Sequence, residues 1–407
     1  CIETQSGLPV YLVGLDRWFG NSRRSEDIYT SDPAAYIAFC RVAAVIASRG
    51  TDGWVPDVVH SHDWHAGLVA PYLRWMKEDR RRPTVHTVHN LAYAGVFGRD
   101  VFDMAGFPTE AYTMDGLEYY GGFSFLKAGM VYSDMTTTVS PTYAREVETD
   151  EFGGGLAGLV RYLKSQRRFT GILNGIDTDV HDPERDPALP VHYSAEHEAG
   201  KQECKAALQA ECGLDPEPRA PLVGMVSRIC EQKGHDLVAA CADRMVAAGC
   251  QLVVLGVGDA ALETSLVCAS SRHPGRVAVK IGYDAYLAPR IYAGSDMFLM
   301  PSRFEPCGLG QLIALRYGAV PIVRRTGGLA DTVRDIGERP RAGNGFVFDD
   351  MTPEAMLGAL DRALALFTRR DAWKRLMVRG MREDHSWPVQ ASRYEALYRS
   401  VQRRRSA

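Results

Sequence analysis

The feature that most constrains this chain is the regular alternation of short apolar runs with helix-like segments. The runs are rich in β-branched residues, and most end in Gly, His, Ser or Asn. Runs that are apolar throughout predict strands buried on both faces, and their alternation with helices predicts parallel βαβ units. We therefore expect an α/β fold. Examples are "DVVHSHD", "TVHTVHN", "MTTTVSP", "PLVGMVSR", "QLVVLGVGD", "RVAVKIGY" and "MFLMPSR".

This alternation pauses between about residues 171 and 220, which suggests a boundary between two domains. The pause contains "GILNGIDTDVHDPERDPALP", whose Asp, Pro and Gly content is typical of a linker or hinge. The strand–helix pattern resumes at Pro221, and 407 residues are enough for two domains. We expect two Rossmann-like, doubly wound domains facing each other across a cleft, with ligands at the C-terminal ends of the strands.

The bulk composition excludes several classes of protein. A formal net charge of -3 does not favour a nucleic-acid or membrane-surface partner. There is no run of about 18 apolar residues, so we expect no membrane span. The nine cysteines are scattered without a C-x-x-C motif, which suits a reducing compartment such as the bacterial cytoplasm or, for a plant or algal protein, the plastid.

The segment "PDVVHSHDWHAGL" concentrates four good metal ligands: His60, His62, Asp63 and His65. Their order is close to the H-x-H-x-D-H of metallo-β-lactamase-like zinc hydrolases, although the position of the aspartate differs. Alternation along the strand places His60 and His62 on one side. Three interpretations stay open: a zinc site, a site for a sugar or nucleotide, and polar turns with a structural role. We favour the second.

A neighbouring strand supports that preference, because "TVHTVHN" ends likewise in polar residues, namely His86, His89 and Asn90. Two strands of one sheet would then deliver imidazoles and amides to one edge. A metal needs three or four converging ligands with a second shell, whereas sugar hydroxyls accept a looser arrangement. We expect Asp63 to cap the helix that follows the first strand.

In the second half, "GMVSRICEQKGHDL" places Arg228 and Lys233 on the turn between a strand and a helix. Both side chains can point at one anion there, and Arg and Lys together suit a diphosphate. The alternative is a salt-bridged surface loop.

A more specific signal is "MFLMPSRFEPCGLGQL", in which a buried strand is followed by Glu305 and then by Cys307, Gly308 and Leu309. Gly308 permits close approach of a ligand, and the following helix offers free N–H groups to phosphate. A carboxylate beside an anion site makes sense if it binds neutral hydroxyls. A nucleotide-sugar has both features, a diphosphate and adjacent hydroxyls.

Two further turns fit such a ligand. Thr326, Gly327 and Gly328 follow the next strand and precede a helix, as in phosphate-binding turns. Tyr283 follows another strand and has two interpretations, stacking on a nucleobase or packing at the rim of the domain. For Cys307, we favour small size beside Gly308 over a role as a catalytic thiol.

Taken together, these segments resemble the bacterial glycogen synthases and plant starch synthases of glycosyltransferase family 5, which have the GT-B fold. The resemblance runs from about residue 10 to the end. It implies domains at residues 1–170 and 171–386, with a final helix at 387–407 that returns to the first domain. The matching segments are "PDVVHSHDWHAGL", "TVHNLAYAGVF", "FLKAGMVYSDMTTTVSPTYAREV", "GILNGIDTDV", "VSRICEQKG", "SRFEPCGLGQL" and "VRRTGGLADTV".

The resemblance implies transfer of glucose from ADP-glucose to the non-reducing end of an α-1,4-glucan, with retention and without a metal or other cofactor. Arg228 and Lys233 would bind the diphosphate and stabilise the departing ADP. Glu305 would hold glucose hydroxyls. His89 would lie beside the reacting sugar.

For the substrate-binding residues, the resemblance places Asp63 and Asn174 on the glucose or acceptor side and Tyr283 at the adenine. The backbone N–H groups of Cys307 and Gly308 would assist Glu305. Leu309 and the turn formed by Thr326, Gly327 and Gly328 complete the expected site, and the oligomeric state stays open.

The chain departs from the family pattern in several places. About seventy residues with the first strands and a K-[TV]-G-G-L loop are expected to be absent, so the first domain would be truncated and its sheet would expose an edge. Gly310 replaces the Thr usual in C-G-L-T-Q, His181 replaces a Trp, and Ala157 replaces an acidic residue. The alternatives to a synthase are an inactive nucleotide-sugar or glucan binding module and a retaining glycosyltransferase with another donor.

Overall fold

The structure is a computed structural model, and it describes residues 2–4, 7–12, 14, 32–76 and 82–406. The chain divides into two compact units, each of which is described by itself. The first unit comprises Cys1–Val139, Ala144–Gly171 and Arg393–Ala407. The second comprises Ser140–Tyr143 and Ile172–Ser392.

A four-stranded parallel sheet with the order β3-β4-β8-β9 forms the centre of the first unit. Its strands are β3 (Val59–His62), β4 (Thr84–Val88), β8 (Met135–Thr138) and β9 (Phe169–Gly171). The helices of this unit include α2 (Pro33–Arg49), α3 (Val69–Trp75), α4 (Arg99–Ala105), α5 (Phe125–Tyr132) and α7 (Ala157–Ser165). An antiparallel sheet, β5-β7-β6, is formed by β5 (Val96–Phe97), β6 (Glu118–Tyr119) and β7 (Gly122–Ser124), and a hairpin by β1 (Ile2–Glu3) and β2 (Pro9–Val10).

Threonines make the central strands of this sheet unusually polar, and hydrogen bonds compensate for their burial. Thr87 and Thr137 share a hydrogen bond of 2.6 Å between neighbouring strands, and Thr138 donates to the Val88 carbonyl at 2.8 Å. The Thr87 hydroxyl also lies 2.6 Å from Nε2 of His60. A line of side-chain hydrogen bonds therefore crosses β3, β4 and β8.

The end of the chain packs on the same sheet. The C-terminal part of α16 (Trp387–Ser406) places the Tyr398 hydroxyl 2.7 Å from Nδ1 of His60, while Val401 packs against Val85 and Met135. In the described part of the chain, no helix combines the length and the apolar character that crossing a membrane requires.

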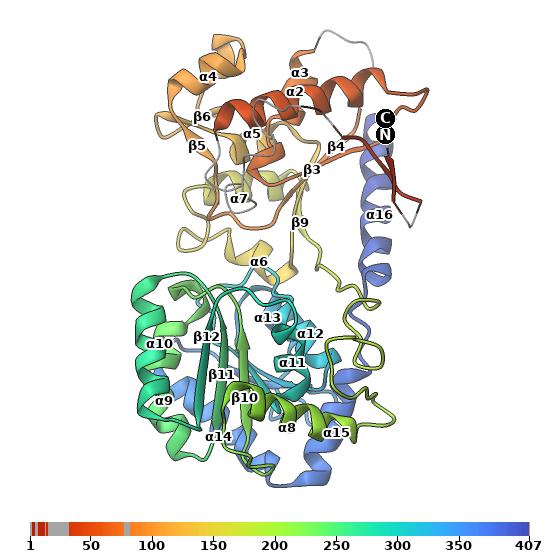
Figure 1. The fold of residues 1–407 in the computed structure, drawn as a ribbon. Helices are drawn as coiled ribbons and strands as arrows, with labels where there is room; N and C mark the ends of the chain where they lie inside the picture. The colour runs from red at the N-terminus through yellow and green to blue at the C-terminus, as the bar shows by residue number, and fades with distance from the viewer. Residues whose placement is uncertain (1, 5–6, 13, 15–31, 77–81, 407) are drawn as a thin grey trace. The chain divides into compact units, whose positions relative to one another are not determined.

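The second unit contains a six-stranded parallel sheet with the order β12-β11-β10-β13-β14-β15. Helices cover both of its faces (Figure 1). This is the strand order 3-2-1-4-5-6 of the Rossmann fold, so the α/β, doubly wound prediction is confirmed. The strands are β10 (Leu222–Val226), β11 (Gln251–Gly256), β12 (Val277–Ile281), β13 (Met297–Met300), β14 (Val320–Arg324) and β15 (Phe346–Phe348). The helices include α8 (Gly200–Cys212), α9 (His235–Ala247), α10 (Ala260–Arg272), α11 (Leu287–Gly294), α12 (Gly310–Arg316), α13 (Gly327–Thr332), α14 (Pro353–Phe367) and α15 (Arg370–Met381).

The buried residues of β11 show why a continuous apolar run forms such a strand. Leu252 and Val254 belong to the cluster that includes α9 and α14, whereas Val253 and Leu255 pack in the cluster with α8 and α11. Successive side chains of a strand point to opposite faces, so both faces need apolar residues when helices cover both.

The sheet reverses its strand order between β10 and β13, and this reversal fixes where a ligand can bind. Helices connect the strands on opposite sides of this point, so the loops that leave the two C-terminal strand ends diverge and leave a crevice. Those loops carry residues 227–234 and 301–309, which include most of the predicted donor site.

A buried ion pair at the other end of the sheet joins α8 to β13. The Lys205 ammonium lies 2.6 Å from Asp296, and both side chains are at most 5% exposed. Lys205 also donates to the Ala220 carbonyl, and Asp296 accepts from the Leu222 amide at 2.9 Å. The pair therefore ties the start of β10 and the start of β13 to one helix.

Replacing one member of this pair should be more damaging than replacing both. Asp296→Asn leaves the Lys205 ammonium buried without a counter-charge and should lower the free energy of unfolding by about 3 kcal/mol. The double variant Lys205→Met/Asp296→Asn removes both charges and keeps an acceptor for Leu222, so it should be more stable than Asp296→Asn alone. Urea unfolding of the second unit tests this, and additive losses would contradict it.

Candidate active site

The centre of the candidate site is an ion pair between the loops that follow β10 and β13. Nζ of Lys233 lies 2.5 Å from Oε2 of Glu305, and the Ser302 hydroxyl donates to the same oxygen at 3.1 Å. Glu305 is buried, with 5% of its surface exposed, whereas the Lys233 side chain is 17% exposed. A cation and a carboxylate thus meet at the switch point of the sheet, where Rossmann-like domains bind nucleotides.

The loop that carries Glu305 is held in place from both sides. Arg303 binds the Asp236 carboxylate with two nitrogens, at 2.7 and 2.6 Å, and Arg324 donates to the Arg303 carbonyl at 2.6 Å. The hydrogen bond from Arg303 lowers the pKa of Asp236. Gln232 adds a hydrogen bond of 3.3 Å to the Phe304 carbonyl. A bidentate Arg–carboxylate pair fixes orientation as well as distance, so the Glu305 backbone is well positioned.

The glycines of the predicted phosphate turn pack directly against this loop. Gly328 N–H donates to the Glu305 carbonyl at 3.0 Å, and a Cβ on Gly327 would lie 1.8 Å from that same oxygen. A Cβ on Gly328 would lie 2.0 Å from the Cys307 carbonyl. Thr326, just before them, is buried. Close backbone packing therefore accounts for both glycines in this structure.

The turn between Glu305 and α12 presents backbone donors. Gly308 has φ of +72°, and Gln311 donates to its carbonyl at 2.9 Å and to that of Cys307 at 3.1 Å. The N–H groups of Cys307, Gly308 and the half-exposed Leu309 donate no hydrogen bond within the part of the chain that the structure describes. Burial raises the pKa of the Cys307 thiol to about 12, an effect that the Asn174 backbone partly offsets, so the thiol stays protonated.

Two predicted residues lie at the same edge of the sheet but on its surface. Arg228 follows β10 and is exposed, and Tyr283 follows β12 with 91% of its surface exposed. The structure therefore brings Lys233, Glu305 and the turns after β13 and β14 together, and it leaves Arg228 and Tyr283 at the periphery.

In the first unit, the ends of β3 and β4 meet through His62, Asp63 and His89. Nδ1 of His62 lies 3.0 Å from Nε2 of His89, and the Asp63 carboxylate accepts the His89 backbone N–H at 2.8 Å. The expectation that Asp63 caps the following helix was wrong, because its side chain makes no cap hydrogen bond there. Its backbone φ of +54° directs the carboxylate toward the neighbouring strand instead.

Two other histidines of this cluster, the half-buried His60 and the fully buried His86, form hydrogen bonds with hydroxyl groups. His60 lies between the Thr87 and Tyr398 hydroxyls, and Nδ1 of His86 lies 2.9 Å from the Ser61 hydroxyl. Burial, with a smaller contribution from neighbouring imidazoles, lowers the pKa of both His60 and His86 to about 3. Both rings are therefore uncharged at neutral pH.

The fourth residue of the histidine motif, His65, faces another way. Its ring stacks on Trp64 with the centroids 4.0 Å apart, and it also contacts the Tyr36 ring edge-on. Within the described ranges, no three His, Cys, Asp or Glu side chains converge as metal ligands do. The polar edge is arranged as pairs of side chains instead.

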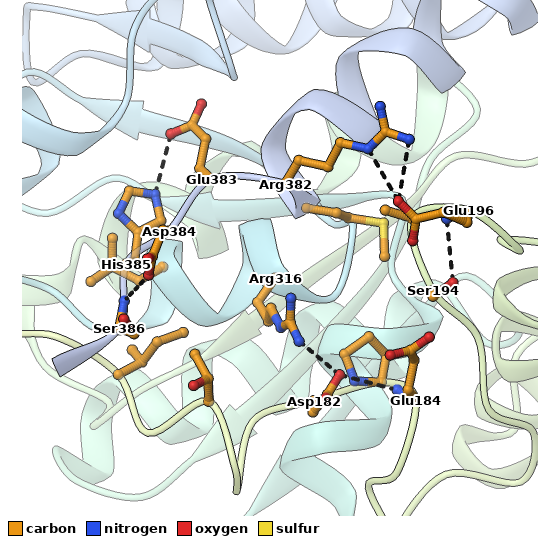
Figure 2. Close-up of a pocket in the computed structure, with 16 residues that line it drawn as sticks. Asp182, Glu184, Ser194, Glu196, Arg316, Arg382, Glu383, Asp384, His385 and Ser386 are labelled. Carbon is orange, nitrogen blue, oxygen red and sulfur yellow. Dashed lines mark hydrogen bonds and ion pairs between the residues drawn. The ribbon is translucent and has the colours of Figure 1, made fainter. Parts of the chain in front are cut away.

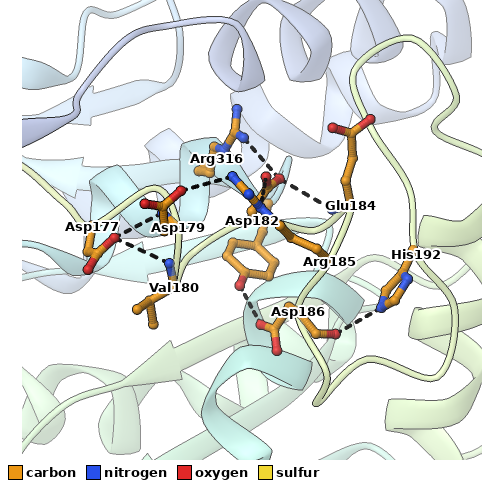
Figure 3. A network of polar contacts seen from close by, with 10 residues as sticks. Asp177, Asp179, Val180, Asp182, Glu184, Arg185, Asp186, His192 and Arg316 are labelled. Atoms are coloured by element: carbon orange, nitrogen blue, oxygen red, sulfur yellow. Dashed lines mark hydrogen bonds and ion pairs between the residues drawn. The ribbon is translucent and has the colours of Figure 1, made fainter. Parts of the chain in front are cut away.

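A separate polar cavity of about 390 Å³ lies in the second unit (Figure 2). Two ion pairs line it: Arg316 binds Asp182 at 2.9 Å, and Arg382 binds Glu196 at 3.2 Å. The Asp182 side of this network continues through Arg185 to the acidic loop around Asp179 (Figure 3). These ion pairs hold the linker segment against the domain, and the cavity contains none of the predicted site residues.

Two residues that support the site were not predicted from the sequence. Ser302 holds Glu305, and Gln311 ties the turn at Cys307 to Thr332 at 3.1 Å. Ser302 stands three residues before Glu305, a spacing at which a hydroxyl can reach a carboxylate across a tight loop. The Gln311 contact depends on α13 and has no local signal.

Comparison with known proteins gives consistent results for both units. Residues 1–162 match the family model "Starch synthase catalytic domain", and residues 214–375 match "Glycosyl transferases group 1". A glycogen synthase of Anaeromyxobacter dehalogenans is 48% identical over 405 residues, covering 97% of this chain and 83% of the relative. A glycogen synthase of Syntrophotalea carbinolica is 45% identical over 401 residues, covering 97% and 82%.

Solved structures give a similar result. The catalytic domain of starch synthase IV from Arabidopsis thaliana, bound to ADP and acarbose, matches with a TM-score of 0.86 and 34% identity, covering 95% of this chain and 80% of that one. A sucrose-phosphate synthase from Thermosynechococcus elongatus matches with a TM-score of 0.60 and 19% identity, covering 94% and 81%, and supports the fold alone. These matches confirm the expected GT-B architecture.

The low pKa values of His60 and His86 should make the first unit sensitive to acid. Their folded pKa of about 3 lies below the ordinary value of 6.5, so the unfolded chain binds more protons between these values. The stability of the unit should therefore fall as the pH is lowered from about 6.5 toward 3. Denaturant unfolding at a series of pH values should show a shallower loss for His60→Gln than for the original chain. An equal slope would contradict this, and His197→Gln, at an exposed position, is the control.

Proposed function

Because this chain belongs to the glycogen synthase family of glycosyltransferases, we propose that it transfers glucose from ADP-glucose to the non-reducing end of an α-1,4-glucan. The transfer would retain the anomeric configuration and use no metal. The choice of ADP-glucose and of a glucan is supported by the ADP and acarbose bound in the similar starch synthase. The pairing of Lys233 with Glu305 at the switch point is the observation that carries the proposal.

This pairing suits a nucleotide-sugar because such a ligand carries a negatively charged diphosphate directly beside neutral sugar hydroxyls. Its diphosphate requires a cation, and the hydroxyls of the adjacent glucose require acceptors. Lys233 and Glu305 lie next to each other and neutralise one another before the donor binds. On donor binding, the Lys233 ammonium would turn from Glu305 to the diphosphate. Glu305 would then accept hydrogen bonds from the glucose hydroxyls.

Departure of ADP creates negative charge on the oxygen that leaves the anomeric carbon. Preorganised cations at that oxygen lower the barrier, because they need no reorganisation when the charge develops. Lys233 is positioned for this role by the switch-point loop, and Arg228 follows the same strand at the surface. We assign both residues to the diphosphate.

The glucose would be bound by Glu305 and by the backbone beside it. Within the described chain, both hydrogen bonds to the Glu305 side chain end on Oε2. Oε1 is therefore available to accept hydrogen bonds from sugar hydroxyls. The N–H groups of Cys307, Gly308 and Leu309 supply the complementary donors. Thr326, Gly327 and Gly328 would support this arrangement by backing the Glu305 loop.

Residues of the first unit are assigned to the reacting sugar and the acceptor. Asp63 holds the backbone of His89, and His62 holds its ring, so the carbonyl or ring of His89 would stabilise positive charge on the reacting sugar. We assign Asp63 and Asn174 to the glucose or acceptor and Tyr283 to the adenine. The acceptor hydroxyl would attack from the side that ADP leaves, without an enzymic nucleophile, which agrees with the protonated Cys307 thiol.

Incorporation of labelled glucose into glycogen, measured in EDTA with ADP-glucose or UDP-glucose, tests the proposal. We expect transfer from ADP-glucose in preference to UDP-glucose. Preference for UDP-glucose would identify a glycosyltransferase with another donor. Binding of ADP without transfer, in folded protein, would identify a binding module.

Removing either member of the central pair should abolish most of the transfer. Lys233→Ala and Glu305→Ala should each lower kcat about 10²–10³-fold, as expected for groups that act on developing charge or fix the reacting sugar. Lys280→Ala, which removes an exposed lysine at the end of β12, should leave the rate unchanged and serves as the control. Near-normal turnover in Lys233→Ala or Glu305→Ala would refute the assigned roles.

A further inference from the structure

The turn between β6 and β7 in the first unit displays two tyrosines that no step of the proposed reaction uses. Tyr119 and Tyr120 are in edge-to-face contact, with ring centroids 4.8 Å apart and an interplanar angle of 85°. Tyr120 is 80% exposed. We call this pair the tyrosine platform.

The backbone of Tyr120 is in a conformation that a tyrosine disfavours. Tyr119 pairs with Gly122, so Tyr120 and Gly121 form a two-residue hairpin loop, with φ of +47° and +82°. These are the φ signs of a type I′ turn, which strongly favours Asn-Gly or Asp-Gly. A bulky residue with positive φ is an outlier, and such outliers cluster at ligand-binding sites. Turn stability therefore gives no reason for a tyrosine at position 120.

Burial does not explain a tyrosine at position 120 either, because the side chain is exposed. Hydrogen bonds nevertheless fix both tyrosine rings. The Tyr119 hydroxyl donates to the Gly154 carbonyl at 2.6 Å, and the Tyr120 hydroxyl donates to the Gly155 carbonyl at 3.3 Å. Gly155 has φ of +82°, which strains residues with a side chain, and a Cβ there would lie 2.6 Å from the Tyr119 hydroxyl. The glycine loop at residues 153–155 thus holds both rings, and the Tyr120 ring remains open to solvent.

The surroundings of the platform indicate what kind of ligand it fits. Gly154 and Gly155 are exposed, and their N–H groups donate no hydrogen bond within the described residues. A fixed aromatic face beside unused backbone donors suits a ligand with one apolar face and hydroxyls around its edge. A pyranose ring has these features, whereas a purely apolar ligand would leave the donors unused.

The platform also lies at the edge of the sheet where the first unit presents its polar residues. The helices α5 and α7 begin just after the β6–β7 hairpin and the glycine loop, and each leads into the N-terminal end of a strand of the parallel sheet. Their first residues therefore lie at the C-terminal edge. In agreement, a Cβ on Gly154 would lie 3.8 Å from the carbonyl of Leu91, two residues after His89.

From these observations we propose that the tyrosine platform, with the loop at residues 153–155, binds glucose units of an α-glucan that lie away from the reacting end. This inference rests on the proposed function for its choice of glucan. It adds a subsite that would retain long chains, while the reaction itself takes place elsewhere.

The test uses binding without a donor, so that it does not depend on transfer. Retardation of the chain in native gels containing glycogen gives a dissociation constant. Tyr120→Asn removes the ring and suits the positive φ, so it should raise that constant about three- to tenfold while leaving the unfolding midpoint unchanged or higher. Tyr120→Phe keeps the ring and should bind nearly as the original chain does. Tyr162→Asn, at another exposed tyrosine of the same unit, is the matched control.

Several outcomes would overturn the inference. In the first, Tyr120→Asn binds glycogen as tightly as the original chain does. In the second, Tyr120→Asn and Tyr162→Asn lose glycogen affinity equally. In the third, Tyr120→Asn binds more weakly only because it unfolds at a lower midpoint. A change in sedimentation with unchanged glycogen binding would show that the platform contacts a second copy of the chain. If the original chain binds glycogen through Tyr120 and transfers no glucose, the platform stands and the proposed transfer fails.

Discussion

The reversal of strand order between β10 and β13 is the constraint on which the chemistry of the second unit depends. Parallel strands bring all their C-terminal ends to one edge, and the reversal separates two adjacent loops at that edge. Lys233 and Glu305, 72 residues apart in the chain, meet there within 2.5 Å. Because Arg303, Arg324 and the glycines at residues 327–328 anchor the second loop, the carboxylate is buried and oriented before a ligand arrives.

In the first unit, the main feature is a group of imidazoles that lie together at one edge of the sheet, the inner ones without charge. Hydroxyl groups from Thr87 and Tyr398 pair both ring nitrogens of His60, and the Ser61 hydroxyl pairs Nδ1 of His86, while burial favours the neutral form of both rings. His62 and His89 remain at the polar end of the same strands. The inner histidines are thus structural, and the outer pair is the part of the motif that faces a substrate in the proposed reaction.

The sequence predicted the buried strands, the Rossmann-like organisation and the loops that carry polar residues, because these follow from local periodicity and turn chemistry. It did not predict which side chains meet. The Lys233–Glu305 contact, the support from Gln311 and the Asp63–His89 hydrogen bond all join segments distant in the chain. Gly327 and Gly328 show why: a phosphate-binding turn and close backbone packing both require glycine, and the three-dimensional contacts of these residues distinguish the two roles.

The Lys233–Glu305 pair has a consequence for how ligand binding at this site would depend on salt. A bare cationic site attracts mobile anions, and a ligand must displace them, so its affinity falls steeply with ionic strength. Here the counter-ion of Lys233 is covalently part of the protein, and in the proposed reaction a donor would separate the two side chains and bind both of them. Small anions that carry no hydroxyl, such as sulfate or chloride, would gain little from such an exchange because they offer no hydrogen bond to Glu305. In the proposed reaction, the site would thereby select ligands that satisfy both members of the pair at once.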